Sequence, residues 1–158
     1  LGWTDRLPKL VAAQSAMAAP IAAAFDKGLA EIEPVTARRT VAESIQVGNP
    51  SALGWRALAA VRESKGIAVA LNDDEILDAQ SLQARLAGIF AEPAACTSLA
   101  GAKKLRAAGV IDQGDLVVCN VTGHGLKQPE AIRIPEEELQ PIAPNLTALR
   151  EELRRKER

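Results

Sequence analysis

One stretch limits the possible folds of this chain more than any other. Residues 115–121 form an apolar, β-branched run that stops abruptly at Thr122, which is followed by two glycines around His124. Because the run shows little polar alternation, it predicts a strand buried on both faces of a parallel sheet covered by helices. Such sheets bind ligands at the carboxyl ends of their strands. The segment therefore predicts either a binding crevice beside the Thr122 hydroxyl or an ordinary strand-to-loop turn, since glycine is common in loops.

The other apolar runs alternate with helical patterns along the chain. The predicted strands are 7–14, 67–71 and 115–121, with a very short apolar link at 89–91 in the place of a further strand. The predicted helices are 16–27, 51–65, 73–87, 93–108 and a last one after Asn145, with an irregular crossing at 31–49. Pro20 suits the first turn of its helix, and Gly28 suits the position just past its end. This alternation with short turns predicts an α/β fold, in which a parallel sheet is flanked by helices in three αβα layers.

Four polar residues, Asn72 to Glu75, follow the predicted strand 67–71. Asn72 suits a helix N-cap, and Glu75 stands three residues later, as in a capping box. Carboxylates in a first turn also favour the positive end of the helix dipole. This acidic group therefore predicts a capped helix rather than a catalytic carboxylate pair or a metal site.

Composition excludes several classes of partner. The chain has 19 basic and 20 acidic residues and only 3% aromatic residues, so it lacks the basic, aromatic-rich stripe typical of nucleic-acid binding. No apolar run approaches the roughly 20 residues that a membrane span requires. Cys96 and Cys119 have neither zinc-site spacing nor the density of a disulfide framework. We expect a cytoplasmic protein with no nucleic-acid partner, no membrane contact and no metal site.

The character of the chain changes after Lys127, where prolines recur between polar residues. This pattern predicts a linker, and the leucines after Asn145 predict a helix with a narrow apolar stripe. We expect two parts, residues 1–133 with the sheet and residues 134–158 with the Pro-rich linker and the last helix. Because the sequence begins at Leu1 without an initiator Met or a signal-peptide pattern, we also expect it to be a piece of a longer protein.

Three segments together resemble the carboxyl-terminal part of threonine synthase. They are S-I-Q-V-G-N-P at 44–50, I-F-A-E-P-A-A-C-T-S-L-A-G at 89–101 and V-C-N-V-T-G-H-G-L-K at 118–127. Their order and spacing match the family, and the T-G-H-G-L-K part is the most specific. L-G-W at 1–3 and R-L-P-K-L-V at 6–11 are similar to the family as well. The resemblance covers about residues 1–133.

The resemblance implies the fold of the type II pyridoxal-phosphate (tryptophan synthase β-like) enzymes. Residues 1–133 would then be the carboxyl-terminal part of the large domain that binds pyridoxal 5'-phosphate (PLP). The implied reaction converts O-phospho-L-homoserine and water into L-threonine and phosphate. The implied partners are this small-molecule substrate, the upstream lobe of the same enzyme and a second subunit in a homodimer.

Six residues take site roles through this resemblance. Thr122 corresponds to the hydroxyl residue that hydrogen-bonds the pyridine nitrogen of PLP, and a neutral hydroxyl can donate to an unprotonated ring nitrogen. Gly123 and Gly125 would shape the backbone beside the ring. The Gly48–Asn49 loop and the turn at Glu92 resemble segments that approach the cofactor and the substrate pocket.

The resemblance also implies that essential parts lie elsewhere. The lysine that forms the Schiff base with PLP and the loop that binds the cofactor phosphate lie upstream of every matched segment, so we expect no catalytic residue in this chain and no activity of the chain alone. Lys127 follows an exposed loop, whereas an imine-forming lysine must be desolvated to lower its pKa. His124 stands between two glycines, which favours a loop role over that of a general base.

Two alternatives to a threonine synthase remain at this stage. The first is a threonine or serine dehydratase-like PLP enzyme, because that class shares the E-P-A turn at Glu92. The second is a non-catalytic, truncated module that folds alone and binds a partner. The T-G-H-G-L-K and V-G-N-P segments favour threonine synthase over the dehydratases.

Overall fold

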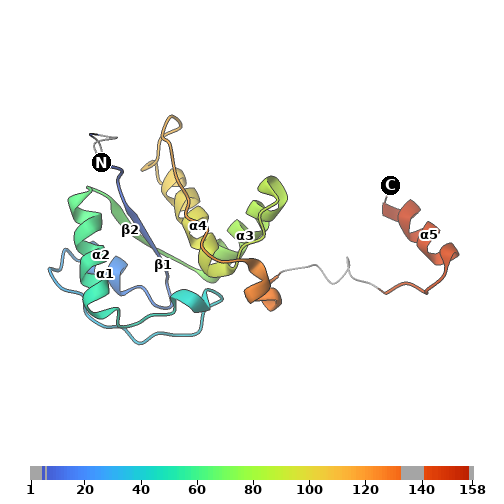
Figure 1. Ribbon diagram of the computed structural model, residues 1–158, viewed down its shortest axis with the longest axis horizontal. Helices are drawn as coiled ribbons and strands as arrows, with labels where there is room; N and C mark the ends of the chain where they lie inside the picture. Colours follow the sequence, from blue (N-terminus) through green and yellow to red (C-terminus); the bar gives the residue numbers. More distant parts are fainter. Residues whose placement is uncertain (1–4, 6, 133–140, 157–158) are drawn as a thin grey trace.

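The computed structural model describes Asp5 and residues 7–132 and 141–156. Its centre is a parallel pair of strands, β1 (Val11–Ser15) and β2 (Ile67–Leu71). Helices α1 (Pro20–Asp26) and α2 (Ser51–Glu63) cover one side of this pair, and α3 (Asp73–Ala87) and α4 (Pro93–Ala107) lie on the other (Figure 1). The predicted α/β class, with helices on both faces of a parallel sheet, is confirmed.

The first helix is shorter than the predicted 16–27. Residues 16–19 instead form a turn in which the Ala16 amide donates to the Leu71 carbonyl at 2.7 Å. Pro20 occupies the first turn and Gly28 has a φ of 66°, as predicted. The Gln14 side-chain oxygen accepts hydrogen bonds from two first-turn amides at 2.9 and 3.1 Å, so a residue at the end of β1 fixes where the helix begins.

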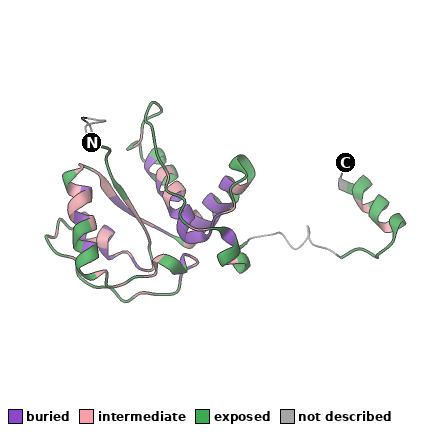
Figure 2. Cartoon of the chain, viewed as in Figure 1, coloured by how far each residue is buried: buried purple, intermediate pink, exposed green. Residues whose placement is uncertain are grey.

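The predicted capping box is present at the start of α3. The Glu75 amide donates to Asn72 Oδ1 and the Asn72 amide donates to Glu75 Oε2, both at 2.8 Å. Gly88 ends α3 in the left-handed conformation. The core lies where α4 packs on the sheet and on α3, and Figure 2 colours much of this region as buried. Its fully buried side chains include Leu71, Ile76 and Cys96.

The prediction of a strand at 115–121 is wrong. These residues join no sheet, and Leu116 and Val118 are 95% and 86% exposed. A strand requires the backbone of a neighbour to satisfy its N–H and C=O groups. Within the described residues β1 and β2 pair with each other, and no third strand lies beside the run. The apolar sequence therefore marks a surface suited to burial.

The last helix, α5 (Leu146–Lys156), is where it was predicted. The Asn145 side chain accepts from the Ala148 amide at 2.9 Å, as expected of its N-cap. Most of the predicted linker, residues 133–140, lies outside the described residues, and Figure 1 draws α5 apart from the other elements. None of the helices in the described part of the chain is both long and apolar enough to cross a membrane.

Candidate functional site

A short antiparallel pairing joins the link before α4 to the glycine-rich loop after residue 121. The Gly125 amide donates to the Phe90 carbonyl at 3.1 Å, and the Glu92 amide donates to the Gly123 carbonyl at 3.0 Å. Between these bonds, Ala91 and His124 form an isolated antiparallel bridge. The pairing brings together three residues that were predicted to share a site.

Both glycines lie close to side chains of the link before α4, which would have to move to admit a larger residue. A Cβ at Gly123 would overlap the Glu92 carboxylate, and a Cβ at Gly125 would overlap the Phe90 ring. The Phe90 and His124 rings also meet edge to face, with 5.7 Å between their centroids. This packing was not predicted from the sequence. The two glycines were expected to let the backbone approach a ligand.

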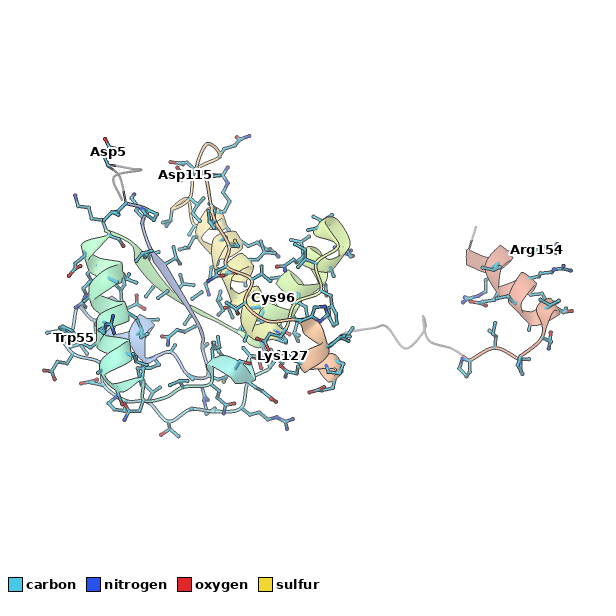
Figure 3. All side chains as sticks on the ribbon, viewed as in Figure 1. Asp5, Trp55, Cys96, Asp115, Lys127 and Arg154 are labelled. Atoms are coloured by element: carbon cyan, nitrogen blue, oxygen red, sulfur yellow. The ribbon has the colours of Figure 1, made fainter. Side chains whose placement is uncertain are left out.

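The Glu92 carboxylate is the centre of the site. Its side chain is only 6% exposed, and Lys127 Nζ lies 2.8 Å from Oε2. Ser44 Oγ donates to the same oxygen at 3.2 Å from η1 (Glu43–Ile45). Lys127 is the last residue of η2 (Gly125–Lys127), and Figure 3 shows it next to η1 and the start of α4. Neither Ser44 nor Lys127 was predicted as a site residue, and their interaction with Glu92 requires the tertiary structure.

Cys96, one turn into α4, has an unreactive environment. Burial, and secondly the negative charge of Glu92, raise the pKa of this thiol from 9.0 to about 11. Burial also raises the pKa of the half-buried Cys119. Because the thiolate is the nucleophile, Cys96 is neutral and inert near neutral pH.

We therefore expect Cys96 to resist iodoacetamide at pH 8 in the folded protein and to react once the protein is denatured. Because the folded-state pKa is raised, the neutral thiol stabilises the fold below about pH 9, and this contribution is lost as pH rises through about 11. It amounts to roughly 3 kcal/mol. Urea titrations at pH 8 and pH 11 check the loss, which should shrink in Cys96→Ala and persist in Cys119→Ala. An equal loss in both variants would contradict the assignment.

The Thr122 side chain is exposed and makes no hydrogen bond with any described residue. Its hydroxyl is therefore available to donate to an external acceptor. Two residues later, His124 Nδ1 accepts from the Leu126 amide at 3.1 Å, so the neutral imidazole carries its hydrogen on Nε2. The hydrogen bond gives His124 the loop role expected from its flanking glycines.

The hydrogen bonds of the Gly48–Asn49 loop go to other segments than the paired residues around Glu92 and Gly123. The Gly48 carbonyl accepts from the Val35 amide at 2.9 Å, and Asn49 Oδ1 accepts from the Ser51 amide at 3.2 Å. Ser51 is held at a φ of 49°, which is strained for a non-glycine residue. Among the described residues, no hydrogen bond connects this loop to Thr122, Glu92 or the two glycines.

A second polar network lies at the carboxyl ends of the strands. Buried Ser15 donates to Thr40 Oγ1 at 2.8 Å, and Thr40 donates to Asp73 Oδ1 at 2.6 Å. The Val41 amide donates to the other Asp73 oxygen at 3.2 Å. The network holds the crossing segment directly before η1 and so supports the position of Ser44. From the sequence, Asp73 was predicted only to stabilise the first turn of its helix.

Comparisons with known proteins agree with this geometry. The model of the family described as "Pyridoxal-phosphate dependent enzyme" matches residues 1–123. The chain is 47% identical over 137 residues to the threonine synthase of Methanocaldococcus jannaschii, which covers 86% of this chain and 34% of that protein. It is 44% identical over 151 residues to the threonine synthase of Methanosarcina acetivorans, covering 96% and 37%. The predicted resemblance to a carboxyl-terminal part is thus confirmed.

Solved structures share the fold. A threonine deaminase from T.th. superposes with a TM-score of 0.50 at 20% identity and covers 61% of this chain and 34% of that one. Maize serine racemase also gives 0.50, at 21% identity, covering 67% and 36%. The chain therefore spans 25–40% of the length of the curated relatives that it matches.

Proposed function

Because the chain belongs to the pyridoxal-phosphate dependent enzyme family, we propose that it is the carboxyl-terminal part of a threonine synthase. The complete enzyme would convert O-phospho-L-homoserine and water into L-threonine and phosphate. The observation that carries this proposal is the 44% identity to a threonine synthase across 96% of the chain. The T-G-H-G-L-K loop, which forms one side of the site, lies inside that match.

The donor groups of the site fit the cofactor. The free Thr122 hydroxyl can donate to a neutral ring acceptor, and the nearby carboxylate of Glu92 is already paired with Lys127. A hydroxyl leaves a pyridine nitrogen unprotonated, whereas an unpaired carboxylate would hold it protonated. When bound, PLP supplies the electron sink for chemistry at the substrate's α- and β-carbons.

Each predicted residue receives a role in this proposal. Thr122 binds the ring nitrogen, while Gly123 and Gly125 keep the backbone of its loop close to the link before α4. Glu92 anchors that loop from the helix side. The Gly48–Asn49 loop would contribute to the substrate pocket, and its strained neighbour Ser51 supports a functional constraint there.

The remaining parts of the proposal concern the complete enzyme. Its imine-forming lysine lies upstream of this chain, and the upstream lobe covers the exposed run at 115–121. We place residues 1–133 in the PLP-binding large domain and residues 134–158 in a linker and terminal helix. The enzyme would act in the cytoplasm as a homodimer.

The full-length protein is expected to bind PLP and to release threonine and phosphate from O-phosphohomoserine. The 158-residue chain alone is expected to form no stable lysine adduct, because its lysines sit at positions where the family has no imine lysine. Borohydride reduction followed by peptide mass spectrometry checks the adduct, and threonine and phosphate assays check the reaction. A stoichiometric adduct on one lysine of the chain alone would contradict the proposal, and Lys127 would be the first candidate.

A dehydratase is the second candidate, because the two superposed structures include a threonine deaminase. That enzyme class would release ammonia and a keto acid from threonine or serine. Assaying the full-length protein with both kinds of substrate separates the two functions. Ammonia release without any turnover of O-phosphohomoserine would replace the threonine synthase proposal.

A further inference from the structure

Three segments far apart in sequence converge on the buried Glu92 carboxylate. Ser44 donates to it from η1, and Lys127 pairs with it from the end of the glycine-rich loop. The Glu92 backbone holds the beginning of the same loop, because its amide donates a hydrogen bond to the Gly123 carbonyl. Glu92 therefore contacts the loop at both ends, through Gly123 and through Lys127. Thr122 directly precedes the first of these two contacts.

The two partners of this ion pair differ in environment. The Glu92 side chain is 6% exposed and the Lys127 side chain 59% exposed. A buried charge is stable only when it is paired and hydrogen-bonded, so Glu92 depends on Lys127 more than Lys127 depends on Glu92. Losing Lys127 would leave an uncompensated carboxylate and release the far end of the loop.

We propose that Lys127 is a positioning residue, whose ion pair with Glu92 latches the 122–127 loop onto the start of α4 and thereby holds the Thr122 hydroxyl in place for the cofactor. This inference rests on the proposed function and assigns Lys127 a role other than imine formation. Lys127 touches neither substrate nor cofactor in this role. It acts through the loop, which is also held by the hydrogen bond from the Gly125 amide to the Phe90 carbonyl. Further hydrogen bonds within the loop run from the Leu126 amide to His124 Nδ1 and from the Lys127 amide to the His124 carbonyl, both at 3.1 Å.

The test uses the full-length protein loaded with PLP and four variants. Lys127→Met removes the charge, Lys127→Arg keeps it, and Glu92→Gln with Lys127→Met removes both charges together. Lys104→Met is the matched control, because Lys104 also forms an ion pair with a glutamate. Its Nζ lies 3.1 Å from Glu75 Oε1, and neither residue belongs to this loop. The readouts are the PLP dissociation constant, the cofactor absorbance spectrum, amide exchange in peptides covering 122–128, and thermal stability.

Lys127→Met is expected to weaken PLP binding about tenfold, which corresponds to about 1.4 kcal/mol. It should also shift the cofactor absorbance and speed amide exchange in 122–128, whereas Lys127→Arg and Lys104→Met keep the parent values for all three readouts. The double variant recovers thermal stability, because no unpaired buried charge remains, yet keeps the fast exchange and the weak PLP binding. If Lys127→Met does not fold, the double variant still shows whether loss of the ion pair speeds amide exchange and weakens PLP binding.

Two results would overturn the latch. One is parent-like exchange and PLP affinity in Lys127→Met, and the other is PLP affinity that returns to the parent value together with stability in the double variant. Failure of the proposed function looks different, because the parent protein itself would then form no threonine from O-phosphohomoserine, whether or not it binds PLP. In that case amide exchange in Lys127→Met would still show whether the loop depends on the ion pair.

Discussion

Thr122→Val in the full-length enzyme is expected to lower PLP affinity and threonine formation by about five- to 150-fold. Valine keeps the branched shape but removes the hydroxyl, so the ring nitrogen faces an apolar wall. An unsatisfied buried acceptor costs about 1–3 kcal/mol, which gives this range. Because the lysine and the phosphate loop of the upstream lobe are untouched, PLP should still bind, with altered absorbance. Cofactor titration and steady-state kinetics measure both effects.

Thr122→Ser is the matched control for this prediction. Serine keeps the donor and loses only a methyl group from an exposed side chain, so most of the activity should remain. Valine and serine variants that both match the parent would show that Thr122 merely ends an extended segment. The cofactor role assigned to the glycine-rich loop would then be wrong.

Gly66→Ala is expected to destabilise the protein by roughly 3–5 kcal/mol, the largest effect on stability predicted for this chain. Gly66 stands directly before β2, and a Cβ there would overlap the carbonyl oxygen of Leu10. That oxygen accepts the hydrogen bond from the Ile67 amide at 3.1 Å, next to the first paired residues of the sheet. A backbone atom cannot rotate away, so the two strands would have to separate. Thermal and urea unfolding of the full-length protein measure the loss.

Gly114→Ala provides the matched control, because nothing lies within 4 Å of a Cβ at this exposed position. Its effect should stay within about 0.5 kcal/mol, as for most surface substitutions. If Gly66→Ala unfolded at the same midpoint as Gly114→Ala, the close approach of β1 to the start of β2 would be contradicted.

The ends of helices and strands could be predicted from the sequence where the residues that set them lie within a few positions of each other. Pro20 and Gly28 bracket α1, and Asn72 with Glu75 begins α3, because these residues act on backbone groups of their own helix. The strand at 67–71 was predicted to the residue, since its apolar run ends at the helix cap. The motifs around Glu92 and Thr122 likewise indicated the family and the segments that form the site.

Only the tertiary structure decided which of these segments meet and what their residues contact. The apolar run at 115–121 has the composition of a strand, yet a strand exists only where a neighbour offers its backbone. Ser44 and Glu92 are 48 positions apart, and no local pattern encodes their contact. Gly123 and Gly125 stand out in the sequence, but the side chains that a Cβ there would displace belong to another segment. Short-range backbone chemistry determined the elements, whereas long-range packing determined the site.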